Sequence, residues 1–263
     1  MCIRDRYTIV QQVVAQLPWG HNVQLLDSLH DHDERLWYAE QAVENGWSRA
    51  VMKYHIDTDL RSRIGRAPNN FATTLPPVES DLVAQTFKDP YIIDFLATVK
   101  YAHERYFEND LIEQVSKFLR ELGTGFSFIG KQHPLSVGGQ DFFIDLLFYH
   151  YRLHRFVVID LKMDHFTPQD AGQMNFYVNV VDKQLRSEHD GMTIGLILCP
   201  DRNSVIVENS LAGMATPIAV SQYRINRPDI ADALPPEEKI DELFDKLIAD
   251  DQDTDDDTSG PRM

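Results

Sequence analysis

Three consecutive segments rich in aromatic and β-branched residues, separated only by short turns, constrain the fold of this chain more than any other feature. They cover residues 126–137, 141–150 and 155–162. Gly138-Gly139 marks the first turn between them. An amphipathic helix is predicted just before them, over residues 104–122, and Gly123 ends it. The pattern therefore predicts one helix followed by three strands.

A second helix with a well-marked start follows these strands. Thr167 can cap it, Pro168 suits its first turn, and the helical pattern runs to about Leu185. Further strands are predicted at 193–199, 205–207 and 218–220. The order α-β-β-β-α-β predicts an α/β fold with a mixed sheet flanked by helices.

The remaining segments divide the chain into three predicted regions. Residues 7–67 have apolar residues at helical spacing, and residues 80–95 predict a further helix with a break at Pro90. The three tryptophans and a local excess of arginine and lysine fall in the first of these segments. We expect a helical N-terminal domain at 7–100, a catalytic α/β domain at 101–235, and a short helix with an acidic disordered tail at 236–263.

One carboxylate lies inside each of two neighbouring strands. Asp145 interrupts an apolar run in the second strand, and Asp160 and Lys162 close the third. Side chains alternate along a strand, so Asp160 and Lys162 share a face. If the turn between the strands is centred between Arg152 and Leu153, paired residues sum to 305 and Asp145 lies opposite Asp160.

Two opposed carboxylates repel each other unless a cation lies between them. Hard oxygen ligands of this kind suit Mg²⁺ or Mn²⁺. Lys162 on the same face can stabilise charge on a phosphate or help to position an attacking water. Together these groups suit the hydrolysis of a phosphodiester bond.

Two further polar residues are candidates for the same site. Glu108 lies on the apolar stripe of the first helix, where it could add a third carboxylate and metal ligand. Glu113 is the alternative acid on that helix, although it lies off the stripe. Gln173 lies two turns into the helix that follows the third strand, where its amide could bind a phosphate oxygen or the water.

Four stretches of the chain resemble the YhcG-like family of bacterial PD-(D/E)XK nucleases. They are Phe118 to Phe126, Phe143 to His150, Val158 to Lys162, and Ala171 to Tyr177. Upstream, Leu17 to Asn22 and Glu44 to Arg49 resemble that family's N-terminal domain. The resemblance extends to about Tyr223 and covers nearly the whole chain.

This resemblance implies a PD-(D/E)XK, restriction-endonuclease-like core behind a helical domain that binds DNA or a partner. By position, the nuclease residues would be Glu108, Asp145, Asp160, Lys162 and Gln173, with Mg²⁺ or Mn²⁺ as cofactor. The first six residues look detached from the rest, and the N-terminal domain is expected to be truncated. Asp164 stands where relatives often carry Gly, which could alter the exit from the third strand.

Charge and composition narrow the possible partners. The net charge is −16, and residues 237–263 alone account for −8, with eleven acids and three bases. We therefore expect nucleic-acid binding that is weak, salt-sensitive and assisted by metal. No apolar run approaches the ~20 residues that span a bilayer, and two cysteines do not form a disulfide framework. These features predict a cytoplasmic protein.

Other interpretations of the motifs are weaker. An isolated Asp-x-Lys triplet is more often a surface salt bridge than a site. The phosphate-loop spacing at 125–131 is rejected because Gln132 replaces the required Ser or Thr. The histidines lack a matching set of zinc ligands.

Three functions remain open. The first is a metal-dependent DNA endonuclease, acting as a homodimer because cutting two strands needs two sites. The second is an RNA nuclease with the same catalytic groups. The third is a non-catalytic DNA-binding or assembly module, against which the intact Asp145, Asp160 and Lys162 argue.

Overall fold

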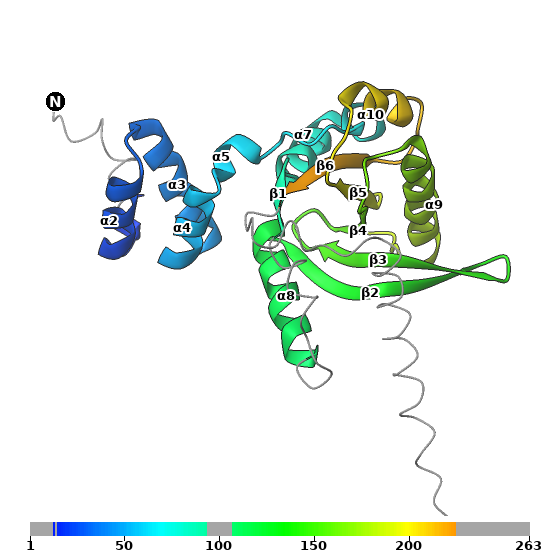
Figure 1. Ribbon diagram of the computed structural model, residues 1–263, viewed down its shortest axis with the longest axis horizontal. Coiled ribbons are helices and arrows are strands. Elements are labelled where there is room, and N and C mark those ends of the chain that lie inside the picture. Colours follow the sequence, from blue (N-terminus) through cyan, green and yellow to red (C-terminus); the bar gives the residue numbers. More distant parts are fainter. Residues whose placement is uncertain (1–12, 14, 94–106, 225–263) are drawn as a thin grey trace, which may run out of the picture.

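The structure is a computed structural model that describes residues 13, 15–93 and 107–224, with residues 107–114 described by their backbone alone. The N-terminal part is helical. Its helices are α2 (Trp19–Ser28), α3 (His32–Asn45), α4 (Arg49–Asp57) and α5 (Leu60–Arg63). They bury their own apolar cluster, which includes Leu25, Tyr38 and Met52. The helical pattern predicted for this segment is confirmed over these ranges, and Figure 1 shows the helices as a group beside the sheet.

Local signals explain where these helices begin. The side chain of Asp31 accepts a hydrogen bond from the Glu34 amide, and Ser48 does the same for Val51. Each satisfies a backbone donor that the first turn of a helix leaves without a partner. Gly46 ends α3 in the left-handed conformation.

A six-stranded mixed sheet forms the second part of the molecule. Its strands are β1 (Tyr91–Ile92), β2 (Phe126–Val137), β3 (Gln140–His150), β4 (Arg155–Leu161), β5 (Ile194–Cys199) and β6 (Ile218–Arg224). The spatial order is β1-β6-β5-β4-β3-β2. The strands from β2 to β4 are antiparallel, whereas β4, β5, β6 and β1 run parallel. The predicted α/β class with a mixed sheet is confirmed.

One long helix covers each face of the sheet (Figure 1). Helix α8 (Phe107–Leu122) packs Phe118 and Leu122 into a cluster that holds Val157 and Ile159 of β4. On the other face, α9 (Pro168–Gln184) packs against the cluster that holds Val158. Alternate residues of β4 thus point to different helices. Asp160 has the same parity as Val158, so it lies on the α9 face.

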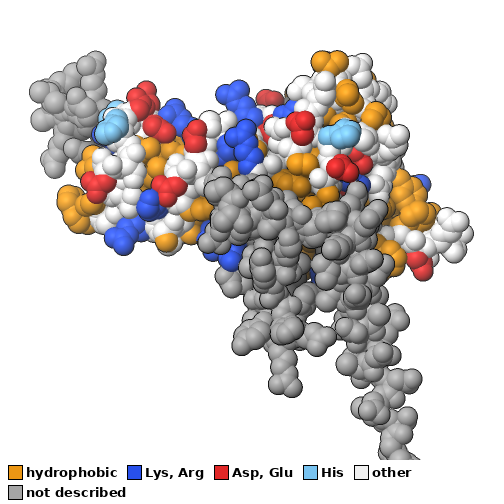
Figure 2. Space-filling model, in the orientation of Figure 1, with side chains coloured by type: hydrophobic (Ala, Val, Ile, Leu, Met, Phe, Trp, Pro, Cys, Tyr) orange, Lys and Arg blue, Asp and Glu red, His pale blue; other side chains and the backbone are white. Residues whose placement is uncertain are grey.

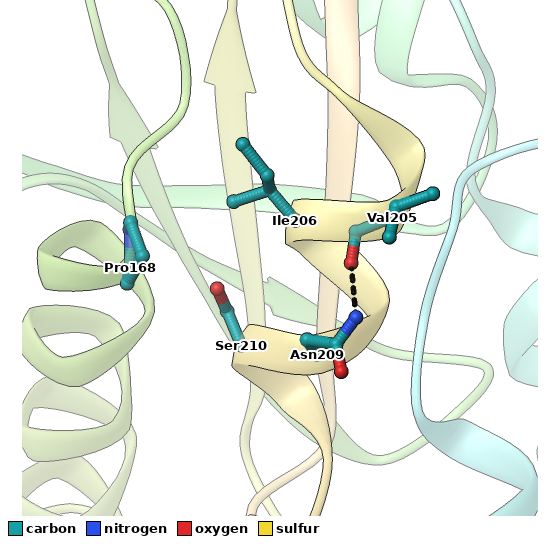
Figure 3. Close-up of a pocket in the computed structure, with 5 residues that line it drawn as sticks. All are labelled: Pro168, Val205, Ile206, Asn209 and Ser210. Atoms are coloured by element: carbon teal, nitrogen blue, oxygen red, sulfur yellow. Dashed lines mark hydrogen bonds between the residues drawn. The ribbon is translucent and has the colours of Figure 1, made fainter.

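The predicted strand at 205–207 is wrong, because these residues open helix α10 (Ser204–Leu211). A short apolar run does not distinguish a strand from a buried helix segment. Asn203 caps the start of this helix and so favours it, because its side chain accepts hydrogen bonds from the Val205 and Ile206 amides. Figure 3 shows a turn of this helix, in which Asn209 bonds back to the Val205 carbonyl.

The helix predicted over 80–95 is only partly correct. Helix α6 (Phe71–Thr74) and α7 (Pro77–Thr86) precede the break, and the chain then turns into β1. The Asp89 carboxylate accepts hydrogen bonds from Ser221 and from the Gln222 amide. These bonds tie the segment to β6, so sheet pairing replaces the helix. None of the described helices has the length and apolar content needed to cross a membrane.

Candidate active site

The predicted register between β3 and β4 is confirmed. Five residue pairs, from Leu146↔Ile159 to His150↔Arg155, each sum to 305. Continuing this register places Asp145 opposite Asp160. The Asp145 carboxylate also accepts a hydrogen bond from the Leu161 amide at 2.9 Å. The two aspartates therefore meet on the α9 face of the sheet.

Asp160 is a buried carboxylate. Its side chain is 6% exposed, and its Oδ2 is paired with the Lys162 ammonium. Burial raises the pKa of Asp160 to about 6, with a contribution from the nearby Asp145 charge that Lys162 opposes. Two buried carboxylates that share one lysine still repel each other, and this repulsion is costly unless a further cation offsets it.

Lys162 lies at the centre of the polar cluster. Its Nζ is 2.8 Å from Asp160 Oδ2 and 3.4 Å from Asp170 Oδ1. Burial alone would lower the pKa of Lys162, but the Asp160 charge and its neighbours raise it above the ordinary value. The ammonium group is therefore charged at neutral pH.

Helix α9 supplies the second wall of the site. Lys162 donates a hydrogen bond to Gln173 Oε1 at 2.9 Å, and Gln173 Nε2 donates to Tyr177 Oη at 2.9 Å. Gln173 and Tyr177 are four residues apart, so they lie on one helical face. The structure therefore brings the predicted Gln173 next to the predicted Lys162.

The Asp170 carboxylate has two partners. Its Oδ2 accepts hydrogen bonds from the Thr167 amide and hydroxyl, which form the predicted cap of α9. Its Oδ1 faces Lys162. Asp170 thus links the start of α9 to Lys162, at the end of β4.

Gln132 belongs to the same cluster but is not among the predicted site residues. Its Nε2 donates to Asp145 Oδ1 at 3.2 Å. Paired residues of β2 and β3 sum to 277 on either side of it, which places Gln132 opposite Asp145. Extending the hairpin arithmetic to the β2–β3 turn at Gly138-Gly139 would have pointed to it.

The donor set fits a divalent cation. Asp145, Asp160 and Asp170 surround the single ammonium of Lys162, so the cluster is net negative. Asp145 and Asp160 are hard oxygen donors, and a cation beside them would offset the repulsion between their two charges. Within the described part of the chain, no group of three or more His, Cys, Asp or Glu side chains is placed to hold a metal. The predicted Glu108 lies outside the described side chains, and so does the alternative Glu113.

A hollow beside the start of α9 contains none of these groups. It has a volume of about 350 Å³ and lies between the start of α9 and helix α10 (Figure 3). Its lining is uncharged and consists of Pro168, Val205, Ile206, Asn209 and Ser210. The polar cluster instead opens to solvent through Lys162, whose side chain is 23% exposed, and through the exposed Gln173.

Two sequence families match the chain. The family described as the YhcG PDDEXK nuclease domain matches residues 84–239, and the DUF1016 N-terminal domain matches residues 3–63. The protein named "Putative nuclease YhcG" of Escherichia coli (strain K12) is 32% identical over 216 residues. That match covers 81% of this chain and 57% of the relative, so the chain spans little more than half of the relative's length.

The similarity to solved structures covers less than half of this chain. A repair endonuclease from Pyrococcus abyssi has 19% identity, covers 49% of each chain and gives a TM-score of 0.31. The complex of EndoMS with dsDNA2 has 16% identity, covers 46% of this chain and 43% of its own, and gives a TM-score of 0.29. At these TM-scores the overlaps say nothing of activity.

The family match covers more than half of the chain and includes the whole polar cluster between the sheet and α9. The chain therefore belongs to the YhcG family of PD-(D/E)XK nuclease domains.

Proposed function

We propose that this chain hydrolyses phosphodiester bonds of DNA with the help of a divalent cation. The observation that carries the proposal is the meeting of Asp145 and Asp160 on neighbouring strands, with Lys162 beside them. Family membership in a nuclease domain supports the same reaction class. Asp145 and Asp160 would hold Mg²⁺ or Mn²⁺, with Glu108 as the expected third ligand.

The bound cation would supply Lewis-acid stabilisation of the charge that develops on the phosphate. The chain's own groups have separate tasks. The Lys162 ammonium, charged and partly exposed, stabilises negative charge on the phosphate oxygens. Gln173 holds Lys162 from the solvent side and can donate to a phosphate oxygen or to the attacking water. The buried Asp160 and the bond from Gln132 to Asp145 keep the two carboxylates in place.

The excess of negative charge at the site supports the need for a metal. Three carboxylates against one ammonium repel an anionic polymer, so a cation is needed before a phosphate can approach. The cluster reaches solvent at Lys162 and Gln173, so a strand would approach it from that side.

The first experiment incubates the purified chain with plasmid, linear duplex, single-stranded DNA and RNA, with Mg²⁺ or Mn²⁺. We expect cleavage of DNA that EDTA abolishes and that Asp160→Asn reduces at least ~100-fold, as loss of a transition-state group does. Asp141→Asn is the matched control, because Asp141 is an exposed aspartate of β3 away from the cluster. It should leave cleavage unchanged.

Other outcomes identify the alternatives. Cleavage of RNA alone, with the same dependence on Asp160, would make the chain an RNA nuclease. If no polymer is cut and calorimetry shows no metal binding that depends on Asp145 and Asp160, the non-catalytic binding module replaces the proposal.

We also propose that the helical N-terminal region contacts DNA or a partner and that the chain acts as a homodimer. The exposed side chains of Arg49, Lys53, Arg61 and Arg66 give this region a local basic surface. Figure 2 shows Lys and Arg side chains, among Asp and Glu side chains, over the N-terminal helices and at their junction with the sheet. Sedimentation equilibrium, with and without duplex DNA, tests the dimer: a single monomer mass in both would refute it.

A further inference from the structure

A second cavity lies at the junction between the N-terminal helices and the sheet. It has a volume of about 470 Å³. Residues of α3, α4, α7, α8 and the turn between β3 and β4 contribute to its wall. This turn is at the opposite end of β4 from Asp160. At ~3.3 Å per residue, the seven residues from Leu153 to Asp160 separate the cavity from the polar cluster by roughly 20 Å.

The charged side chains that line the cavity are all basic. They are Lys88, Arg120 and Arg152, and no Asp or Glu is among the lining residues. This is unexpected in a chain with 41 acidic and 25 basic residues. Arg120 and Arg152 are exposed, and neither is within ion-pair distance of an acid in the described part of the chain. Two cations without acidic partners on one cavity wall are well placed for an anion.

Lys88 and His55 form the buried end of the cavity. Lys88 is 4% exposed, and its ammonium donates to the carbonyl of Glu121 at the end of α8. His55 is 2% exposed, and its Nδ1 has no hydrogen-bond partner among the described residues. A buried ring nitrogen without a partner is costly, and a polar ligand in the cavity would relieve that cost.

The rest of the wall suits a flat, partly apolar group. Trp47 is half-buried, and its ring centroid is 4.4 Å from that of His55. Leu119, Leu153 and Ile64 add apolar surface beside it. Aromatic and apolar side chains next to arginines are the combination that binds bases and their phosphates in single strands.

We propose that this junction cavity binds a phosphate group together with its attached nucleobase. Arg120 and Arg152 contact the phosphate, and Trp47 and its apolar neighbours contact the base. The ligand is either a free mononucleotide or the phosphorylated end of a nucleic-acid strand. Because the N-terminal helices and the sheet both contribute to the wall, an occupied cavity would also link the two parts of the molecule.

The test measures binding by the whole chain in EDTA and in the Asp160→Asn background, so that cleavage plays no part. The probes are adenosine 5′-monophosphate by calorimetry and a labelled 5′-phosphorylated single-stranded hexanucleotide by fluorescence anisotropy. We expect Arg120→Gln/Arg152→Gln to weaken binding at least ~10-fold, which is the loss of about 1.4 kcal/mol. Arg120→Glu/Arg152→Glu should abolish it.

The control is Lys183→Gln/Arg186→Gln, which removes the same charge from exposed residues near the end of α9, outside the cavity. Binding in this variant should stay within ~2-fold of the parent, since distant surface charges are screened by salt. Binding of the mononucleotide identifies a free nucleotide as the ligand, and binding of the hexanucleotide alone identifies a strand end. Binding of neither probe at millimolar concentration, or equal losses in the cavity and control variants, overturns the proposal. Because no step requires cleavage, an inactive nuclease site would leave the result unaffected.

Discussion

At the scale of single residues, Gln132 adopts a backbone conformation that residues with a Cβ atom rarely adopt. Its φ is +44°, in the left-handed region, within strand β2. Such a conformation costs a residue with a Cβ ~1–2 kcal/mol. The same residue donates to Asp145, so the strained backbone aims the Gln132 amide at this carboxylate.

Gln132→Gly should relieve the backbone strain and at the same time remove the hydrogen bond to Asp145, so stability and cleavage should change differently. Glycine accepts a positive φ, so the free energy of unfolding should stay equal or rise by up to ~1 kcal/mol. Loss of the bond to Asp145 should reduce DNA cleavage ~3–10-fold, or about 1 kcal/mol. His154→Gly is the control, because exposed His154 also has a positive φ, +50°, but lies in the β3–β4 turn. Equal effects of the two variants on cleavage would contradict the role of Gln132.

Two buried histidines predict a loss of stability in mild acid. Burial lowers the pKa of His55 to about 3, aided by the charges of Lys88, Arg63 and Arg120, and burial lowers that of His150 to about 4. In the unfolded chain their pKa is near 6.5, so the unfolded state binds protons first as pH falls below that value. Stability is thus complete above pH 6.5 and declines until pH reaches the folded values.

At pH 5.5 each histidine should reduce the free energy of unfolding by about 1.4 kcal/mol relative to pH 7.5. Urea titrations at the two pH values measure this loss. His55→Phe should remove one histidine's share of it, whereas His30→Phe, on the exposed surface, should retain the whole loss. An equal loss of unfolding free energy between pH 7.5 and pH 5.5 in His55→Phe and in the parent would contradict the role of His55.

At the scale of elements, helix α9 places Gln173 and Tyr177 one turn apart in a hydrogen-bond chain to Lys162. Tyr177 reaches Lys162 only through Gln173. Gln173→Ala should lower DNA cleavage ~10-fold, and Tyr177→Phe ~3-fold, because the phenylalanine keeps the packing and loses one hydrogen bond. The double variant should be no worse than Gln173→Ala, since the tyrosine acts through the glutamine. Multiplied losses in steady-state cleavage assays would show that Tyr177 acts independently.

The same elements show what a sequence can predict. The β3–β4 register was predictable because a tight turn fixes strand pairing, and this placed Asp145 opposite Asp160. The same arithmetic from the Gly138-Gly139 turn places Gln132 opposite Asp145, but it fails for residues 126–128, whose pairing an irregularity between Phe128 and Gly130 shifts by one residue. Asp170 could be predicted as a cap, but its contact with Lys162 depends on how α9 docks onto β4, which no local pattern encodes.

At the scale of the whole molecule, Glu121 joins the N-terminal helices to the sheet. This residue of α8 is 1% exposed and forms an ion pair with Arg63 of α5 at 2.5 Å. It also accepts hydrogen bonds from Tyr54 of α4 and from the Ile92 amide of β1. One carboxylate of α8 thus holds α4, α5 and β1, and its partner residues lie 29 or more positions away in the sequence. Breaking a buried ion pair from one side leaves the other charge unpaired, which costs ~3–5 kcal/mol.

Glu121→Ala should therefore loosen the junction before it unfolds the sheet. All three tryptophans, Trp19, Trp37 and Trp47, lie in the N-terminal part, so fluorescence reports on that part and circular dichroism on the whole chain. In the parent the two urea transitions should coincide. In Glu121→Ala the fluorescence transition should move to lower urea and separate from the circular-dichroism transition.

Lys53→Ala is the control, because it removes an exposed ion pair with Asp57 on α4. This loss costs under ~0.5 kcal/mol and should leave the two transitions together. If the two transitions of Glu121→Ala coincide, the N-terminal helices and the sheet still unfold together without the Glu121 carboxylate. The junction would then be held mainly by apolar contacts.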